Sequence, residues 1–374
     1  MTSPCQASRV AGRLAALLLA GAIAGCGLPL HDTASGVRVL TAAPPSTEEE
    51  YCAWYGSRAG ELLYFGQSAF WSAMRANKGD PRADLDRPGP QPIGRFDLRT
   101  ERMLEAIDVG RADSRSGIWD VLVREKKLWY TTFFEAAGLL ELETGQLRRF
   151  PELGVGLNEW TAGPARSVLV TRYGDGQTRS GSVLMLGTEG TLRAEWPLPN
   201  PPKTRIAAKT PGWDGKRARL WLSSDALTRS GGEPAGHPTF ILDLAARSWQ
   251  RRDEPELQFV AFDSEDTGYR AELQGRRLEL VVEPAHTPAR RLLLDADFPG
   301  AFDFVQDIQP AADGRVVVTR WSGHLHILDP RGALRDIQLP KLREGGLYYS
   351  AVLWGKRVCA TYCAGVRVVC ADAA

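Results

Sequence analysis

The sequence predicts an all-β protein, a seven-bladed β-propeller of four-stranded antiparallel blades, and three observations support this fold class. Short apolar runs, such as residues 128–133, alternate and end at turn residues, which is typical of strands. Long helical periods are hard to find, and the chain is long for one ordinary core. A strand-and-turn pattern also recurs along the chain. Two separate domains would show a change of composition after residue 48, and the sequence has none.

The recurring unit is a strand that ends in an acid or a glycine, followed by a turn and a second strand. Its successive markers lie 44, 46, 56, 40, 46 and 43 residues apart. Units of about 45 residues have room for four short strands, as in propeller blades. The alternative is chance periodicity, because the fifth unit is a loose match. The markers are Asp97, Glu141, Gly187, Asp243, Glu283, Asp329 and Asp372.

A second recurrence accompanies the first, a threonine followed by an aromatic residue at a strand end. It occurs at 131–133, 171–173 and 319–321, with a degenerate copy at 360–362. From their place in the repeat, these segments are predicted to close the second strand of units two, three, six and seven.

One unit carries a resemblance to a known family. Its two segments are LWYTTFFE at 128–135 and GLLELETG at 138–145. Together they resemble a blade of the streptogramin lyase-like propellers, and of the wider group that includes NHL-repeat and gluconolactonase-like proteins. At repeat level the resemblance covers roughly 93–372 and implies the architecture. The catalytic histidines and acid of the lyases have no matching motif here, so the resemblance does not extend to lyase activity.

The N-terminus predicts export and lipid anchoring. Arg9 and Arg13 precede an apolar run at 14–24, which is shorter than the roughly 20 residues of a membrane-spanning helix and typical of a signal peptide. The run ends in Ile-Ala-Gly before Cys26, which resembles a bacterial lipobox. Residues 1–25 are therefore expected to be removed and Cys26 to carry the lipid, palmitate included. The alternative is an ordinary secretory signal with a chance cysteine.

The segment after the lipobox predicts a tether and a compartment. Residues 26–48 are rich in proline, threonine and serine, the composition of a linker, and 49–374 form the propeller. Gly27 replaces the aspartate of an inner-membrane retention signal, which favours the outer membrane on its periplasmic or outer side. Loss of two arginines changes the formal charge from +1 to −1, so no basic excess suits nucleic acid.

The ends of the chain are predicted to meet in one blade. The last unit has room for three strands, at 347–354, 357–363 and 365–371, before the sequence ends. An unpaired blade edge invites unwanted strand pairing. The segment from Val37 to Leu40 is therefore expected to supply the missing outer strand.

Four cysteines remain after the lipobox, and an even number in an exported protein favours disulfides. Cys359 and Cys370 mirror each other about the turn at 364–365, so they are expected to pair across a hairpin. Cys363 would then reach Cys52. Four cysteines permit three pairings. A metal site is disfavoured because the 359/363 spacing has no second pair beside it.

The predicted ligand site lies over the central funnel, on the face where two long connections, 68–92 and 228–238, leave the sheets. An arginine beside an aromatic residue suits a carboxylate, a phosphate or a sugar ring. The alternative is that the arginines pair with acids at the starts of the first strands and hold neighbouring blades together. The funnel residues are Arg172, Tyr173, Arg320, Trp321, Asn158, Glu159, Gln306 and Asp307.

Two other groups are predicted to be structural. His324 and His326 share one face of a strand, but they lie on a third strand, away from the funnel, with no third ligand near in sequence. Asp295 and Asp297 are expected to be loop acids rather than a calcium pair. Motifs of common hydrolases and nucleotide-binding proteins are missing from the sequence.

These features favour a membrane-anchored binding or scaffold module for a protein, peptide or glycan, without a cofactor. The alternative is a metal-dependent enzyme of lactonase or lyase type with its site in the funnel. That reading requires three or four ligands converging on the axis around a divalent metal. The candidate ligands are Glu159, Asp307, Asn158 and Glu135.

Overall fold

The computed structural model describes twelve stretches of the chain. They are residues 38–41, 52–68, 89–112, 117–132, 137–154, 156–173, 181–199, 204–228, 237–299, 303–342, 346–363 and 365–373. The predicted signal peptide, the lipid-carrying Cys26 and most of the tether lie outside these residues, as do Glu135 and the larger parts of the two long connections.

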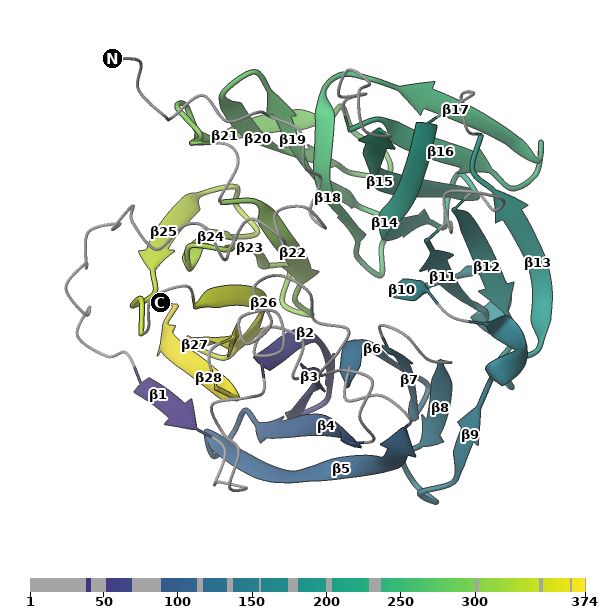
Figure 1. Ribbon diagram of the computed structural model, residues 1–374. Helices are drawn as coiled ribbons and strands as arrows, with labels where there is room; N and C mark the ends of the chain where they lie inside the picture. The colour runs from purple at the N-terminus through teal and green to yellow at the C-terminus, as the bar shows by residue number, and fades with distance from the viewer. Residues whose placement is uncertain are drawn as a thin grey trace, which may run out of the picture.

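The described chain forms an all-β propeller (Figure 1), with antiparallel sheets arranged around a central axis and the first strand of each four-stranded sheet innermost. Five sheets have four strands each. The first two are β6 (Ile118–Arg124), β7 (Lys127–Thr132), β8 (Gly138–Glu141) and β9 (Leu147–Arg149), then β10 (Leu157–Ala162), β11 (Val168–Arg172), β12 (Ser182–Leu186) and β13 (Leu192–Pro197). The third is β14 (Thr204–Asp214), β15 (Arg219–Thr228), β16 (Thr239–Asp243) and β17 (Ser248–Arg252). The last two are β18 (Glu256–Phe262), β19 (Gly268–Gln274), β20 (Arg277–Glu283) and β21 (Arg290–Asp295), then β22 (Val305–Pro310), β23 (Val316–Arg320), β24 (His324–Leu328) and β25 (Leu334–Gln338).

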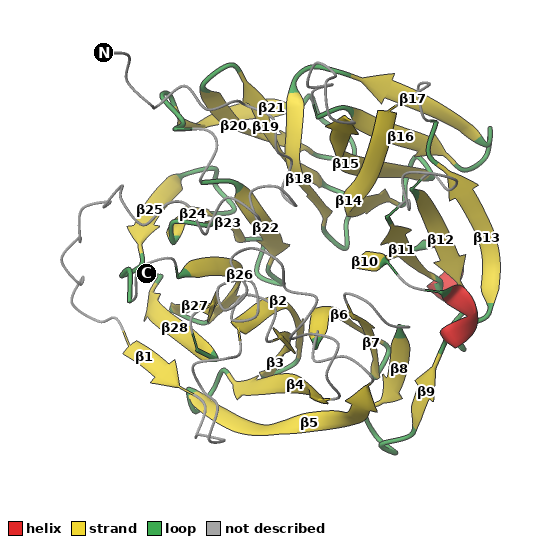
Figure 2. Cartoon of the chain, in the orientation of Figure 1, coloured by secondary structure: helices red, strands yellow, loops and turns green. Residues whose placement is uncertain are grey.

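The sixth sheet has eight strands and joins the two ends of the described chain. Its order is β1 (Arg38–Thr41), β28 (Arg367–Asp372), β27 (Arg357–Cys363), β2 (Cys52–Ala59), β3 (Leu62–Ser68), β4 (Gly89–Asp97) and β5 (Arg102–Ala112), with β26 (Leu347–Trp354) on β27. The described strands thus form five four-stranded sheets and one larger sheet, in which the single pair Cys52/Cys363 links β2 to β27. In Figure 2 the described parts are almost all strand, with short 3-10 turns such as η2 (Pro151–Leu153) and η3 (Pro164–Arg166).

The predicted repeat marks the same place in successive groups of four strands. Five of its markers are the last residues of β4, β8, β16, β20 and β28, and the other two directly follow β12 and β24. Three of the acids at these places, Asp97, Asp243 and Asp329, accept backbone N–H groups of the next turn; Asp329 Oδ1 accepts from Ala333 N at 2.8 Å. At these three places the sequence repeat corresponds to the same kind of tight turn.

The core lies between neighbouring sheets. On β23, Val316 and Val318 pack toward the β18–β21 sheet, while Val317 faces the strands β26–β28. Successive side chains of a strand point to opposite faces, and both faces are covered here. A run of consecutive valines therefore suits this strand better than apolar–polar alternation would.

Each innermost strand carries a β-bulge. Its register on the second strand shifts near the start, as between Ile118 and Asp120, Leu157 and Trp160, or Val305 and Asp307. A bulge adds one residue and redirects side chains. The bulged residues are those that meet around the axis.

Two disulfides lie in the eight-stranded sheet, one across the seam between β27 and β2 and the other between β27 and β28. They join Cys52 to Cys363 and Cys359 to Cys370, the pairing that the sequence favoured. The first connects residues 311 positions apart in the chain and the second residues 11 apart. Strand β1 pairs antiparallel with β28, with Arg38 opposite Cys370. Within the described part of the chain, no helix is long and apolar enough to cross a membrane.

Candidate functional site

An aromatic cluster occupies one side of the axis. Trp54 lies with its ring centroid 4.2 Å from that of Trp119 and 4.5 Å from that of Tyr349. Trp321 joins them, 6.5 Å from Tyr349. These side chains come from β2, β6, β26 and the end of β23, and all are buried. Aromatic pairs at such distances add about 0.5–1.5 kcal/mol each beyond their burial, so this side of the funnel is a packed core.

Three buried acids, Asp120, Glu159 and Asp307, lie on innermost strands around the axis. Asp120 on β6 accepts Trp160 N of the next sheet at 2.7 Å through Oδ2 and Val121 N at 2.8 Å through Oδ1. Asp307 on β22 accepts from Ser350 Oγ of β26 and from Gln309 Nε2 at 3.0 Å. Both carboxyls thus hold an inner strand to its neighbour.

Burial governs the charge of these carboxyls. It raises the pKa of Asp307 to about 7, with a smaller rise from the carboxylate of Glu159, against the hydrogen bonds from Ser350 and Gln309. Burial also raises the pKa of Asp120 well above its usual range, and the charges of Glu159 and Asp307 add to that rise. The two N–H donors on Asp120 oppose the shift without overcoming it. Like charges near one another disfavour ionisation.

The recurring threonine fixes the bulges. Thr171 Oγ1 accepts Glu159 N at 3.1 Å, and Thr361 Oγ1 accepts Ser350 N at 3.1 Å. Thr361 also donates to Trp54 O at 2.8 Å across the seam. Thr131 donates in the same way to Asn158 O of the next sheet, at 2.7 Å. Thr171 thus links an inner strand within its own sheet, Thr131 links to the following sheet, and Thr361 does both, whereas the hydroxyl of Thr319 makes no such bond among the described residues.

The two funnel arginines are bound internally. Arg172 contacts Glu195 of β13, and Arg320 contacts Asp303 and, at 2.9 Å, Asp295. The alternative that they would pair with acids at the starts of the first strands is wrong as to the partners, although Arg320 does link its sheet to the preceding one through Asp295. Both side chains are at least nine-tenths buried. Each is held by acids of outer strands and connections, where the side chains at the end of a second strand can reach.

The remaining funnel residues divide between the two sides of the axis. Asn158, Glu159 and Asp307 are buried among the axial acids, as is Gln306, which accepts a hydrogen bond from Tyr55 at 2.8 Å. Trp321 belongs to the aromatic cluster. Tyr173 is partly exposed beyond the end of β11, where its N–H donates to Gly156 O at 2.8 Å.

Four residues of this centre were missed by the sequence reading: Asp120, Trp54, Trp119 and Tyr349. Their common signal is position, because each lies at the bulge of an innermost strand. Aligning the four units that carry the recurring threonine would have brought Asp120 into one column with Glu159 and Asp307, and Trp119 with Tyr349 into the column before it.

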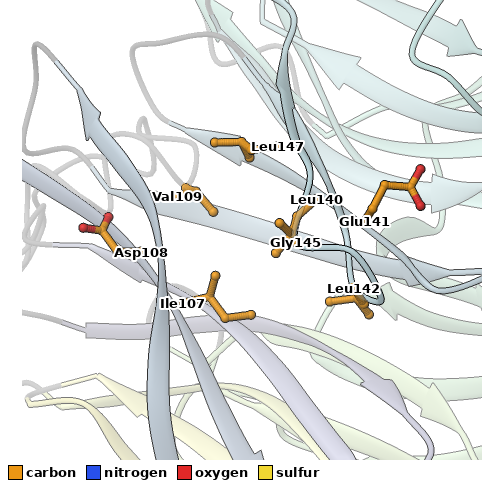
Figure 3. Close-up of a pocket in the computed structure, with 8 residues that line it drawn as sticks. All are labelled: Ile107, Asp108, Val109, Leu140, Glu141, Leu142, Gly145 and Leu147. Carbon is orange, nitrogen blue, oxygen red and sulfur yellow. The ribbon is translucent and has the colours of Figure 1, made fainter.

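Two groups lie away from the axis. A groove of about 240 Å³ on the outside of the ring runs between β5 and the strands β8 and β9 (Figure 3), and Ile107, Leu140 and Leu147 are among its lining residues. His324, His326 and Asp336 meet on β24 and β25. Burial lowers the pKa of both imidazoles, that of His326 to about 4. The ligand atoms of His324, His326 and Asp336 all lie within 4.8 Å of one another. Among the described residues, no other group of three or more histidines, cysteines, aspartates or glutamates is placed to hold a metal ion.

The predicted loop acids are engaged in ion pairs. Asp295 pairs with Arg320, and Asp297 pairs with Arg276 at 2.6 Å. Both acids therefore have basic partners, as expected of structural residues.

Comparison with known proteins shows the fold. No family model matches the chain, and no curated protein matches its sequence. Among solved structures, the chain is similar to a catalytically inactive virginiamycin B lyase from Staphylococcus aureus with quinupristin, at a TM-score of 0.58 and 11% identity, over 90% of this chain and 98% of that one. It is also similar to YCF48 from Cyanidioschyzon merolae, at a TM-score of 0.55 and 9% identity, over 90% and 99% of the two chains. At these identities the likeness establishes a β-propeller and nothing about activity.

Proposed function

We propose that this chain is an exported, lipid-anchored β-propeller that binds a protein, peptide or glycan partner on the face where the long connections leave the sheets. The signal and lipobox residues support the anchor, with residues 1–25 removed and Cys26 lipidated at the outer membrane. Two disulfides support an oxidising compartment such as the periplasm.

We further infer that the ring has seven blades, two of them fused in the eight-stranded sheet. Strands β2–β5 would be the first blade and β26–β28 with β1 the last. The repeat supports this division, because β4 and β28 end in its markers as β8 and β16 do. The bond from Thr361 to Trp54 O also matches that from Thr131 to Asn158 O between two separate sheets.

The observation that carries the binding proposal is the difference between the two faces of the ring. On one face, first and second strands meet in tight turns, such as Gly60–Glu61 between β2 and β3. On the other, the chain leaves β3 at Ser68 and returns at Gly89, and leaves β15 at Thr228 and returns at Thr239. Loops on a rigid scaffold commonly carry binding residues. The axial arginines and acids, by contrast, are engaged within the ring.

Membrane fractionation tests the anchor. Cys26→Ser should move the protein from the membrane to the soluble fraction, because a single thiol carries the lipid. Cys5→Ser, which changes a cysteine of the predicted leader, is the matched control and should leave the protein membrane-bound. Unchanged membrane association of Cys26→Ser would contradict the anchor.

Site-directed photo-crosslinking in cells tests the binding face. A photoreactive residue at Arg276, in the turn between β19 and β20 on the proposed face, should give a defined adduct. The same residue at Lys356, in a turn of the opposite face, should give none. A protein partner would yield one discrete band, and a glycan a ladder that collapses on glycosidase treatment. Equal labelling from both positions, or none from either, would contradict the proposed face.

A further inference from the structure

We infer that His324, His326 and Asp336 form a binding site for a divalent transition-metal ion of the zinc type. The two histidines lie on one face of β24, and Asp336 lies opposite His326 on β25. The ligand atoms of the three residues all lie within 4.8 Å of one another. The third ligand, which is distant in sequence, is supplied by strand pairing.

The geometry suits a small coordination sphere. His326 Nδ1 lies 2.7 Å from Asp336 Oδ1, and His324 Nε2 lies 3.9 Å from Asp336 Oδ2. Ligand atoms about 2.0–2.1 Å from a tetrahedral zinc ion are about 3.3 Å apart. Both separations thus need to change by little more than half an ångström, and the two imidazole rings already stack with centroids 4.4 Å apart.

Burial and access are divided among the ligands as a metal site needs. His326 is fully buried, and its Nδ1 already faces the carboxylate of Asp336. The side chain of Asp336 is 54% exposed and that of His324 is 29% exposed. An ion can therefore enter from solvent and keep a water as its fourth ligand, while the buried imidazole fixes the inner side. Imidazole with carboxylate is a ligand set that zinc accepts.

The surrounding charges favour a cation. Arg320 Nη1 lies 3.4 Å from His324 Nδ1, but this guanidinium already donates to Asp295 and Asp303. With Asp336, three carboxylates face one guanidinium, which leaves a net charge of −2 around two neutral imidazoles. A divalent ion would neutralise that charge.

Zinc binding to the full chain, purified in detergent and stripped with a chelator, tests the site. Wild type should bind one Zn²⁺ per chain in a competition titration with a chromophoric chelator. Asp336→Asn and His324→Gln, at exposed or partly exposed positions, should weaken that binding at least tenfold. The matched control is His286→Gln, which removes an exposed histidine elsewhere and should bind as wild type does.

Thermal melting separates ligation from structural damage. Zn²⁺ should raise the melting temperature of wild type and His286→Gln, because a ligand that binds only the folded state stabilises it. It should leave Asp336→Asn and His324→Gln unmoved, while all four proteins melt cooperatively in chelator. Absence of zinc binding by wild type, or wild-type affinity in both cluster variants, would overturn the site.

Discussion

Neighbouring groups of strands are held together differently at the seam between β27 and β2 and at the junction between β6 and β10. At the junction, Asp120 accepts Trp160 N and Thr131 donates to Asn158 O, so hydrogen bonds and the packing of Trp129 against Trp160 hold the two sheets without a covalent link. At the seam, Thr361 repeats the threonine bond to the next inner strand. No carboxylate at the seam is seen to accept a backbone N–H as Asp120 does, within the described residues.

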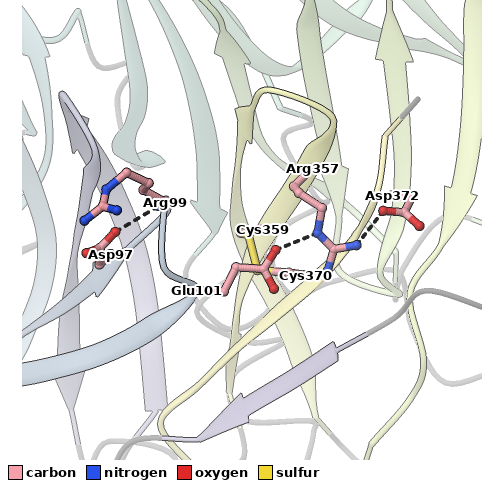
Figure 4. Close-up of a disulfide and its surroundings, with 7 residues drawn as sticks. All are labelled: Asp97, Arg99, Glu101, Arg357, Cys359, Cys370 and Asp372. Carbon is pink, nitrogen blue, oxygen red and sulfur yellow. Dashed lines mark hydrogen bonds and ion pairs between the residues drawn. A yellow bond between two sulfur atoms is a disulfide. The ribbon is translucent and has the colours of Figure 1, made fainter.

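At the seam, a disulfide and ion pairs replace the hydrogen bond that Asp120 accepts at the junction. The Cys52–Cys363 bridge joins the inner strand β2 directly to β27, the second strand of the last group. Around the second bridge (Figure 4), Arg357 donates to Glu101 at 2.7 Å and to Asp372 at 2.6 Å, tying β27 to the turn before β5. A junction between consecutive sheets is held close by the chain itself, whereas the seam joins segments over 300 residues apart. The comparison indicates that the seam needs stronger links, because bringing together segments so far apart in the chain costs the most conformational entropy.

The largest effect is expected from removing the long-range bridge. The Cys52→Ala/Cys363→Ala double variant should lose about 5 kcal/mol of unfolding free energy, because the bridge closes a loop of about 300 residues. The Cys359→Ala/Cys370→Ala control, which opens a short hairpin loop, should lose about 3 kcal/mol. Denaturant unfolding of the three oxidised proteins measures both. Equal losses would show that the seam is no special point of closure.

The next largest effect is a pH dependence that belongs to the acid-held junctions. The carboxyl of Asp307 has a pKa of about 7 in the folded protein and an ordinary value of 3.8. Between these values the folded protein holds a proton that the unfolded chain releases, so stability falls as pH rises and levels off above 7. At about 1.4 kcal/mol per pKa unit, the fall is at most about 4 kcal/mol.

Melting at pH 5 and pH 8 checks this dependence. Asp307→Asn should reduce the difference, to which Asp120 also contributes, while the exposed-acid control Glu265→Gln should keep it in full. A wild-type protein that is more stable at pH 8 than at pH 5, or an Asp307→Asn variant with the wild-type slope, would contradict the assignment.

A smaller loss is expected at the ordinary junction. Asp120→Ala leaves the buried N–H of Trp160 without its acceptor, which costs about 1–3 kcal/mol. Asp120→Asn keeps one acceptor oxygen and should lose less. Chemical denaturation ranks the two variants, and a loss for alanine no greater than for asparagine would count against the hydrogen bond to Trp160.

The smallest effects compare the two threonines. Thr131→Val removes the interstrand hydrogen bond to Asn158 O, and Thr361→Val removes two, from Ser350 N and to Trp54 O; each lost bond should cost about 1 kcal/mol. In a background without the Cys52–Cys363 bridge, Thr361→Val should cost more than before and Thr131→Val the same, because neighbouring interactions are not additive. A double-mutant cycle measures this coupling, and equal coupling for both threonines would separate the hydroxyl of Thr361 from closure of the seam.

Much of the fold could be read from the sequence, because its signals are local. The turn acids after third strands and the threonines of second strands recur at fixed places, and each depends on a hydrogen bond within a few residues or one strand away. The strands predicted at 347–354 and 357–363 coincide with β26 and β27 for the same reason.

The site was less accessible to sequence reading, because its contacts cross between sheets. Nothing near Arg320 in the sequence indicates that Asp295 of the preceding sheet will hold it. Likewise Asp336 becomes a neighbour of His326 only through pairing of β24 with β25. Bulges also shift the inner strands by one residue, which hid Asp120 from a reading based on strand alternation.

Peptide mapping of the unreduced protein tests the closure of the ring most directly. Chymotrypsin cuts after Tyr362 and trypsin after Arg367, which separates Cys359, Cys363 and Cys370 into different peptides. Mass spectrometry should then find the Cys52 peptide joined to that of Cys363, and Cys359 joined to Cys370. A Cys52 peptide that is free, or joined to Cys359 or Cys370, would contradict a ring whose two ends are locked together at this seam.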